Sequence, residues 1–446
     1  MATRREFMQR GGAIAAGLLA APALGSLAAC SSKSDSGPMS FWNFYGPGGG
    51  VPAQDRWFRT TVAQWNRRQR TDRDRIALRY VPNGDYISGS VLSTGFAAGN
   101  GPDVFLLSPG DFLRYYNGGA LQDLTPHLAP GLREDYVPGA LETRTVGDRV
   151  YGLPMELEPL AVYYDKRAFD RAGVSEPPAT WNELLELGAR LRTGNTFGML
   201  FETVPGYYQN FTWYPFMWMG GGSPVNADSD GSSFDSASVK AALNLWGESV
   251  RRGIAPRSVL GSGGGDITAN LGSGFTAMQQ TGVWAIADHA AGAAKDVPIG
   301  VFKLPVPPGG QYTTALGGWA FVANARGKNP ERAAEFCAWA LGSTDAAGIE
   351  RCRQWNTVVK TNLPPRRSVR ALAERRGAFT GLFKTFADEI AVGARGEPRY
   401  PPQVYKAVSD AIQAVQLGGE PAAGAASRAA DIIDSYLGGY RGADIA

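Results

Sequence analysis

Short apolar runs alternate with stretches of helical periodicity from residue 39 onward, and this alternation constrains the fold more than any other feature. Residues 39–44, 76–81 and 103–107 have the composition of buried strands. Residues 55–68 place aromatic and aliphatic side chains on one helical face, and residues 87–98 are also expected to be helical. Strands that alternate with helices predict an α/β fold in which a sheet with parallel strands is covered on both faces.

The alternation resumes after residue 151. A capping box at Thr180 and Glu183 indicates the start of a helix, and residues 236–252 have a second amphipathic pattern. A repeat of fixed period is not found, which argues against a solenoid or a propeller. A chain of 446 residues is long for one core and natural for two domains. Further strands are expected at 160–164, 197–201, 275–279, 299–304 and 318–323.

The first 30 residues have the pattern of an export signal. The paired Arg4 and Arg5 resemble a twin-arginine signal, and an apolar stretch follows them. The small residues at 27–29 together with Cys30 resemble the lipobox of bacterial lipoproteins, in which the cysteine is lipidated and begins the mature chain. We therefore predict a signal peptide at 1–30, a flexible tether at 31–38, and a lipid anchor on the outer face of the cytoplasmic membrane. An uncleaved transmembrane anchor is the alternative, although the apolar stretch is shorter than the ~20 residues that a bilayer requires.

Cys337 and Cys352 remain as an even pair once Cys30 carries lipid. They lie in two adjacent helical patterns, at 330–341 and 346–354. In an oxidising compartment a disulfide is the favoured interpretation, and closing about 15 residues would contribute roughly 3 kcal/mol. Two buried thiols that pack as small apolar side chains are the alternative.

The composition is that of an ordinary globular protein, with 44% apolar and 19% charged residues. The net charge of +3 falls to about +1 when the signal peptide is removed, and such near-neutrality argues against nucleic-acid binding. The chain has 11 Trp, 17 Tyr and 20 Phe, which suits a cleft that binds sugar through aromatic surfaces.

Patterns that would indicate an enzyme are weak. The two histidines lack metal-ligand spacing, so no metal is expected, and no G-x-S-x-G nucleophile motif is present. The glycine-rich 261–266 lacks the lysine of a phosphate-binding loop and is expected to be a flexible loop. Glu156 and Glu158 could be imagined as a glycosidase pair, but neighbours on one strand point the same way and do not flank a bond.

Several segments carry a family resemblance. The sequence GLPMELEPLAVYYDK at 152–166, followed by FDRAGV and PATW, resembles the central signature of the family 1 extracellular solute-binding proteins, the sugar receptors of ABC importers. The chain departs from that signature at Met155, Glu156 and Asp165, which bears on the ligand and not on the fold. Shorter segments match the same family in the same order: GPDV at 101–104, GFTAM and TGVWA within 274–285, LGGW and AAEF within 316–336, and LPPR at 363–366.

The resemblance implies a periplasmic-binding-protein-like fold of class II. Two discontinuous α/β lobes are joined by hinge strands, and the ligand lies in the cleft between them. One lobe would comprise 39–154 with 315–350, and the other 155–314 with 351–446. A carbohydrate or sugar-like solute would close the hinge, and the permease of an ABC transporter would recognise the closed form.

Two other functions stay open beside this one. A glycerophosphodiester receptor is the alternative within the family, and a surface-anchored carbohydrate hydrolase is the alternative from another class. The favoured function needs no enzyme activity, cofactor or nucleic acid, and we expect a monomer.

The resemblance also implies ligand contacts. Trp284 matches the tryptophan that stacks on sugar in the family. Glu158 stands at the hinge position where a member of the family has a carboxylate that contacts the ligand. Glu156 is expected to share the strand face of Glu158, and one of the two is expected to touch the ligand. Arg366 lies where relatives place a ligand-contacting arginine, with Arg367 as the alternative.

Other candidates follow from their positions after strands. One of Trp42 and Tyr45 is expected to line the cleft, because both follow the first strand. Asp111 follows the third strand, and a helix N-cap is its alternative role. Trp319 follows two glycines at a crossover and could serve the cleft or the core. The aromatic cluster at 207–218, with Tyr208 as a candidate, is expected to form part of the second lobe's wall.

Overall fold

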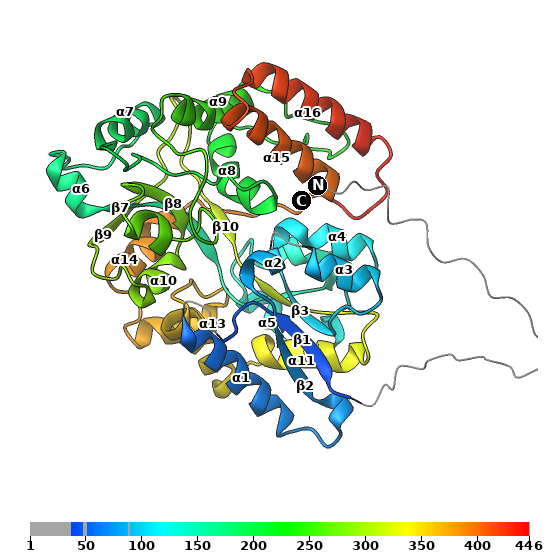
Figure 1. The fold of residues 1–446 in the computed structure, drawn as a ribbon. Coiled ribbons are helices and arrows are strands. Elements are labelled where there is room, and N and C mark those ends of the chain that lie inside the picture. Colours follow the sequence, from blue (N-terminus) through cyan, green and yellow to red (C-terminus); the bar gives the residue numbers. More distant parts are fainter. Residues whose placement is uncertain (1–36, 48–50, 88–89, 446) are drawn as a thin grey trace, which may run out of the picture. The chain divides into compact units, whose positions relative to one another are not determined.

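The computed structural model describes residues 37–47, 51–87 and 90–445. The predicted signal peptide, the lipid site at Cys30 and most of the predicted tether lie outside these residues. The description that follows concerns the body that begins at residue 37 (Figure 1).

The first sheet has five strands in the order β2, β1, β3, β11, β6. β1 pairs in parallel with β2 and β3, whereas β11 runs antiparallel to both β3 and β6. Three sequence-based strands, at 39–44, 76–81 and 103–107, are thus confirmed within a residue. The strands are β1 (Met39–Asn43), β2 (Ile76–Tyr80), β3 (Val104–Leu107), β6 (Leu153–Pro154) and β11 (Ala320–Ala323).

Helices α1 and α11 pack against this sheet. α1 buries Trp57, Phe58, Val62 and Trp65 on one face, as the periodicity predicts. Around the sheet lie α1 (Pro52–Asn66), η1 (Asp72–Asp74), α2 (Asn83–Ile87), α3 (Val91–Ala97), η2 (Pro109–Asp111), α4 (Phe112–Asn117), η3 (Thr125–His127), α5 (Leu132–Asp135), η4 (Glu142–Arg144), the hairpin β4 (Thr145–Val146) and β5 (Arg149–Val150), and α11 (Pro330–Gly342).

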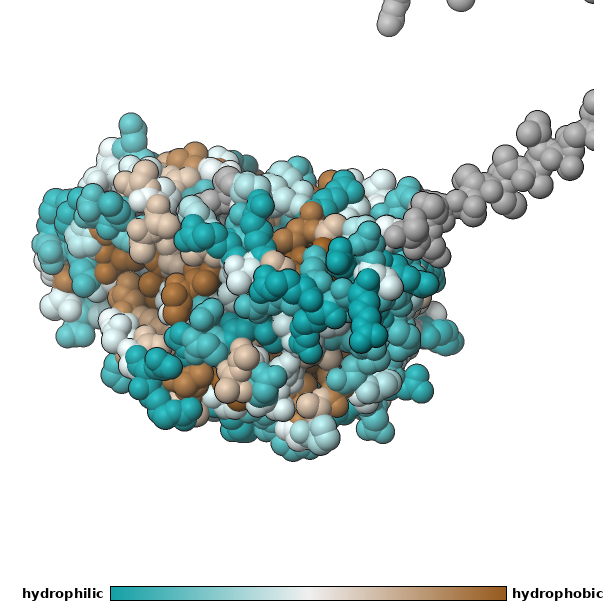
Figure 2. All heavy atoms as spheres, turned by 90° about the horizontal axis from the view of Figure 1, so that it is seen from below, coloured by the Kyte–Doolittle hydropathy of each residue, from teal (hydrophilic) through white to brown (hydrophobic). Residues whose placement is uncertain are grey.

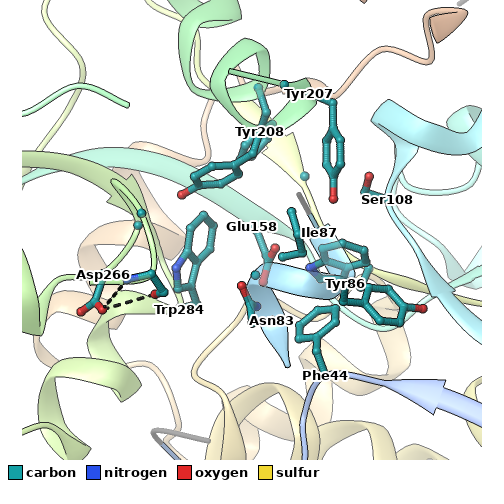
Figure 3. A pocket seen from close by; sticks show the side chains of 18 of the residues that line it. Phe44, Asn83, Tyr86, Ile87, Ser108, Glu158, Tyr207, Tyr208, Asp266 and Trp284 are labelled. Carbon is teal, nitrogen blue, oxygen red and sulfur yellow. Dashed lines mark hydrogen bonds between the residues drawn. The ribbon is translucent and has the colours of Figure 1, made fainter. Parts of the chain in front are cut away.

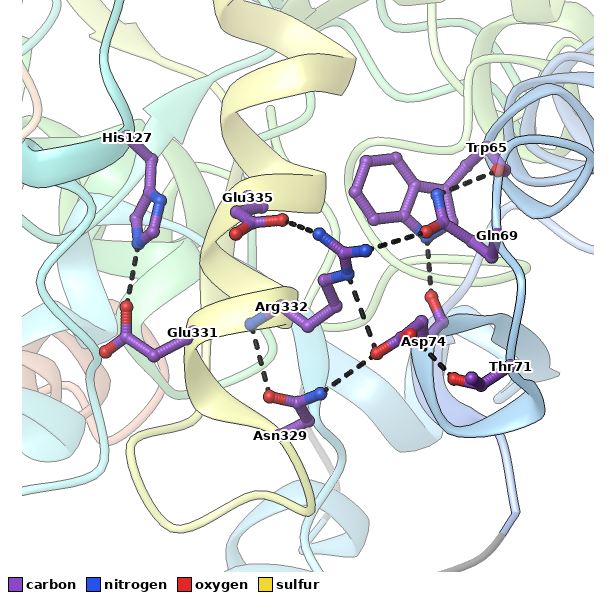
Figure 4. A network of polar contacts seen from close by, with 9 residues as sticks. All are labelled: Trp65, Gln69, Thr71, Asp74, His127, Asn329, Glu331, Arg332 and Glu335. Carbon is purple, nitrogen blue, oxygen red and sulfur yellow. Dashed lines mark hydrogen bonds and ion pairs between the residues drawn. The ribbon is translucent and has the colours of Figure 1, made fainter.

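Polar side chains fix the start of α11 to the segment that precedes β2 (Figure 4). Asn329 caps the helix by accepting from the Arg332 amide at 3.4 Å, and its own amide donates to Asp74 at 3.3 Å. Arg332 also lies 3.6 Å from Asp74 and pairs with Glu335. The Trp65 indole donates to the Asp74 carbonyl at 2.9 Å. These contacts orient α11 over the sheet and contribute modestly to stability, because most lie near solvent.

The second sheet differs from the parallel arrangement that the sequence predicts. β7 pairs antiparallel with β8, β9 and β10, and only β10 and β12 run parallel. Residues 197–201, predicted as a strand, form only isolated bridges to Thr276 and Gln279. The strands are β7 (Glu158–Asp165), β8 (Met278–Gly282), β9 (Ile299–Phe302), β10 (Ala315–Gly317) and β12 (Arg395–Gly396).

The helices of this half include a layer in which α8, α9, α15 and α16 pack on one another (Figure 1). The predicted capping box at Thr180 and Glu183 is confirmed at the start of α7. The remaining elements are α6 (Lys166–Arg171), α7 (Trp181–Leu191), α8 (Tyr207–Met219), α9 (Ala237–Arg251), η5 (Thr268–Gly272), α10 (Ala285–Ala291), α12 (Ala346–Gln354), η6 (Trp355–Val359), α13 (Arg367–Arg375), α14 (Gly381–Thr385), η7 (Phe386–Ile390), α15 (Pro402–Gln416) and α16 (Ala422–Leu437).

Two segments depart from the expected lobe boundaries at 315 and 351. β10, expected in the first lobe, pairs with β7 of the second sheet, because the chain changes sheets only at Gly318 and Trp319. α12 and η6, expected in the second lobe, pack against α11 and α1 of the first half. Their apolar faces find partners there that a boundary drawn from sequence motifs does not reveal.

The disulfide favoured by the sequence is absent, since Cys337 and Cys352 are both free and buried. Cys337 is buried in α11. The Cys352 thiol donates to the Leu341 carbonyl at 3.6 Å. Burial raises the pKa of both thiols. The alternative interpretation, two thiols packed as small apolar groups, therefore describes this structure.

The surface is mainly hydrophilic, and Figure 2 shows one face on which polar side chains surround smaller apolar areas. Within the described residues, helices that combine the length and the apolar character needed to cross a bilayer are absent. The large apolar side chains that are exposed are Val204, Leu260, Val358, Val392 and Ile432.

Candidate functional site

A cavity of about 780 Å³ opens between the two sheets, and its walls come from both halves of the described body. The first half contributes residues that follow β1 and β3, such as Tyr45 and Asp111. These segments meet because the carboxyl ends of parallel strands lie at one edge of a sheet. The second half contributes Glu158 of β7, Tyr208 of α8 and Trp284 at the start of α10.

Aromatic rings form much of the cavity wall (Figure 3). Tyr208 and Trp284 lie on one side, with ring centroids 6.5 Å apart. Phe44 lies on the other side, where its ring meets Trp319 at 4.7 Å and Tyr86 at 5.2 Å. Flat apolar faces on opposite sides of a partly polar cavity suit a solute with apolar C–H faces and a hydroxyl rim.

A buried ion network lies at the floor of the cavity. The Lys360 ammonium is 2.5 Å from Glu158 and 3.2 Å from Glu156, and it also contacts the Tyr45 hydroxyl. The Asn362 amide donates to Glu158 at 2.7 Å. Burial opposes the charge on Lys360, but the two carboxylates raise its pKa well above the ordinary value. The network therefore keeps a lysine charged where water is excluded.

Four further carboxyls on the wall, Asp111, Glu202, Asp288 and Glu397, have pKa values raised by burial. The pKa of Asp111 rises to about 6, although Arg114, 2.6 Å away, opposes the shift. The pKa of Asp288 rises to about 7, and that of Glu397 to about 8. The cavity is thus a poorly solvated place for negative charge.

Six of the nine residues that the sequence proposes as ligand contacts line this cavity. Each of the six lies where a strand or helix begins or ends, or where the chain crosses from one sheet to the other. They are Tyr45, Asp111, Glu158, Tyr208, Trp284 and Trp319.

The other three candidates do not line the cavity. Trp42 is buried, with the Arg79 guanidinium 4.0 Å from the centre of its ring. Glu156 lies beneath the wall, where it binds Lys360 and accepts from the Trp355 indole.

Arg366 has a structural role in the first half. Its guanidinium pairs with Asp135 at 2.8 Å and donates to the carbonyls of Leu341 and Ser343 at 2.8 and 3.0 Å. The side chain is 1% exposed and is not part of the cavity wall, so these donors do not face a solute in the cavity. Neither Arg366 nor the neighbouring Arg367 lines the cavity.

Sequence reasoning missed several wall residues. Asp288 carried a usable signal, because it stands one helical turn after Trp284 and therefore shares its face. Tyr86 also carried one, because it follows the predicted strand at 76–81 as Tyr45 and Asp111 follow theirs. Lys360 and Glu397 carried none, because each reaches the cavity only through contacts distant in sequence. Groups of three or more side chains suited to hold a metal are absent from the part of the chain that the structure describes.

Comparison with known proteins gives consistent matches. The profile of the family described as bacterial extracellular solute-binding protein matches residues 50–347. A probable ABC transporter-binding protein of Deinococcus radiodurans is 25% identical over 311 residues, which are 67% of this chain and 71% of the relative. The galactooligosaccharide-binding protein of Bacillus subtilis is 27% identical over 251 residues, which are 54% of this chain and 56% of the relative.

Solved structures share the fold. The GacH receptor of Streptomyces glaucescens, solved unliganded and with acarbose, superposes with a TM-score of 0.73 at 21% identity, covering 91% of this chain and 100% of the receptor. The maltotriose-binding protein of Thermus thermophilus, solved with maltotriose, gives 0.71 at 22% identity, covering 89% of this chain and 99% of that protein. These likenesses show the two-lobed fold.

Proposed function

The chain belongs to the family of bacterial extracellular solute-binding proteins, and we propose accordingly that it is the carbohydrate receptor of an ABC importer. The observation that carries this proposal is the cavity between the two halves, with Tyr208 and Trp284 facing Phe44 and Tyr86 across it. A solute that touches both walls binds the closed arrangement best, and this difference in affinity shifts the lobes toward closure.

In this proposal the lobes are divided where the chain changes sheets. The first lobe comprises residues 39–154 with 318–375, and the second comprises 155–317 with 376–445. The division is supported by the pairing of β10 with β7 and by the packing of α12 on α11 and α13. The segment that carries Lys360 then extends from the first lobe and meets Glu158 of the second sheet.

A lipid on Cys30 would hold the exported receptor near its transporter and raise the effective concentration there. The Leu27–Cys30 lipobox pattern supports this part of the proposal. Cys30→Ala should release the protein from membranes or stop its maturation. Retention of the variant on membranes would favour an uncleaved anchor.

The two alternative functions fit the cavity less well. An anionic glycerophosphodiester would meet a wall with six acidic and two basic side chains. A hydrolase would need two carboxyls that flank a bond, but Glu156 is covered by the wall and both Glu156 and Glu158 bind Lys360. We propose binding without turnover.

The test is calorimetric titration of the purified protein with a panel of mono-, di- and oligosaccharides, combined with product analysis. Binding of at least one carbohydrate without products supports the proposal, and turnover would refute it. Trp284→Ala should weaken that binding at least about tenfold, because a stacked aromatic face is lost. Val392→Ala, a change at an exposed apolar side chain outside the cavity, is the control and should bind as the parent does.

A further inference from the structure

The charges on the cavity wall are strongly unbalanced. Two basic side chains line it, and each already has an acidic partner: Arg114 pairs with Asp111, and Lys360 with Glu158. The acidic side chains on the wall are Asp111, Glu158, Glu202, Asp266, Asp288 and Glu397. Four carboxyls therefore remain without a basic side chain of the wall beside them.

Two of these four carboxyls are held by backbone amides. Glu202 accepts from the amides of Thr203, Val204 and Gly264 at 2.8 to 2.9 Å. Asp266 accepts from the amides of Ser262 and Ala269 at 3.2 and 2.9 Å. Both shape the loop around residue 263, so their oxygens are largely used within the protein.

The other two carboxyls face the cavity with fewer partners. Glu397 lies against Gly110, whose amide is its hydrogen-bonding neighbour, and Arg144 favours its charge from a distance. The Asp288 carboxyl has no hydrogen bond or ion pair with any residue that the structure describes, although Lys360 favours its charge from a distance. Burial raises the pKa of Asp288 to about 7. An unpaired carboxyl in a poorly solvated wall is costly unless a ligand supplies a donor.

The rings beside Asp288 also attract cations. Asp288 follows Trp284 by one turn of α10, and its amide donates to the Trp284 carbonyl at 3.2 Å. The Tyr208 ring lies 6.5 Å from that of Trp284 on the same side of the cavity. Aromatic faces bind ammonium groups through their quadrupole, and a nearby carboxylate adds a charge-assisted hydrogen bond.

We propose that the solute is a sugar-like molecule that carries a protonated amine, and that Asp288 receives this amine beside Trp284 and Tyr208. The inference rests on the proposed function and narrows its ligand class. An amine on a sugar ring would pair with Asp288, the one acidic side chain of the described cavity wall that has no hydrogen bond or ion pair, while the remaining hydroxyls meet the rest of the wall. A neutral sugar would offer Asp288 no charged donor.

Matched sets of sugars test this directly by calorimetry on the full chain at pH 7. Glucosamine, galactosamine, mannosamine and the glucosamine disaccharide are each compared with their N-acetylated forms and with the parent sugars that carry a hydroxyl instead. At least one amine should bind about tenfold more tightly than both neutral counterparts, because only the amine forms an ion pair in a site with little water. Asp288→Asn should remove that preference, so that the amine and its neutral counterparts bind with affinities within about threefold of one another.

Asp296→Asn is the control for net charge, since Asp296 is exposed and does not line the cavity. It should keep the full preference for the amine. If no amine binds more tightly than its neutral counterparts, the inference is overturned. If neutral carbohydrates then bind, the receptor function stands without it, and if no carbohydrate of either panel binds, both proposals fall.

Discussion

Asp288 and Glu397 make stability depend on pH near neutrality. Burial raises their pKa values to about 7 and about 8, far above those of carboxyls in an unfolded chain. The folded state therefore holds more protons than the unfolded state between pH 4 and 8, so stability falls as pH rises through this range. The groups that act on Asp288 are Lys360, Asp266 and Glu158.

We expect the melting temperature of the ligand-free protein to fall between pH 7 and 8.5. Glu397→Gln and Asp288→Asn should each make the melting temperature depend less steeply on pH, because the amide carries no proton that ionises. His289, whose pKa is lowered by burial, titrates below this window. Scanning calorimetry at several pH values is the measurement, with Asp296→Asn as the control. If the melting temperature of both variants depends on pH as steeply as that of the parent, these two carboxyls are not the source of the pH dependence.

Lys360 is the residue on which the cavity floor depends most. Lys360→Met leaves two buried carboxylates without their cation, which should reduce the free energy of unfolding by about 3–5 kcal/mol. Lys406→Met is the matched control, because Lys406 pairs with Asp410 at an exposed site on α15. That change should cost less than about 1 kcal/mol. Denaturant unfolding measures both, and equal losses would show that the floor network is not stabilising.

The site residues that sequence reasoning placed at the cavity are those whose position follows from local pattern. Trp284 starts a helix after a strand, and Tyr45 and Asp111 follow strand ends. Arg366 shows the limit of this reasoning, since its motif does not reveal that its partner Asp135 lies 231 residues earlier. Partners distant in sequence decide whether an arginine faces a ligand or the core.

Among the elements, the crossing between β10 and β11 is the most constrained. Gly318 has φ of 129°, and a Cβ there would lie 2.2 Å from the Glu156 carbonyl oxygen. Gly318→Ala should therefore cost about 1–3 kcal/mol or more and move Trp319 at the cavity wall. Gly424→Ala in the exposed first turn of α16 is the control and should be neutral or mildly stabilising, by up to about 1 kcal/mol. Urea denaturation compares them, and similar midpoints would contradict the argument.

Element types were predictable where the periodicity was strong, as in α1 and α9. The direction of strand pairing in the second sheet was not predictable, because hydrophobic runs such as that of β7 fit parallel and antiparallel pairing equally well. Residues 197–201 fit a strand by composition, yet they find only isolated bridges. Strand direction depends on connections that periodicity does not encode.

At the scale of the molecule, the proposal requires the two lobes to move. We expect the radius of gyration from X-ray scattering to decrease when a carbohydrate that binds in calorimetry is added, because the lobes close on it. Trp284→Ala at the same ligand concentration should show a smaller decrease. Identical scattering with and without a tightly bound carbohydrate would contradict the closure mechanism.

The two-lobed architecture followed from motif order along the chain, whereas the lobe boundaries did not. A motif marks where a family conserves its pattern, but α12 joins the first half because its apolar face packs on α11. Boundaries thus depend on packing partners that only the folded chain identifies.

The Lys360 ammonium contacts Tyr45, which follows β1, as well as Glu158 of β7. Pulling these groups apart would cost the charged Lys360 and Glu158 their contact in a place with little water, so we expect the floor of the cavity to act as a fixed pivot when the lobes move. Motion then grows with distance from that pivot. A solute would first contact the fixed floor of the cavity, and the rings and carboxyls farther out would then close on it. We therefore expect the outer rim of the cavity to determine which solutes are bound.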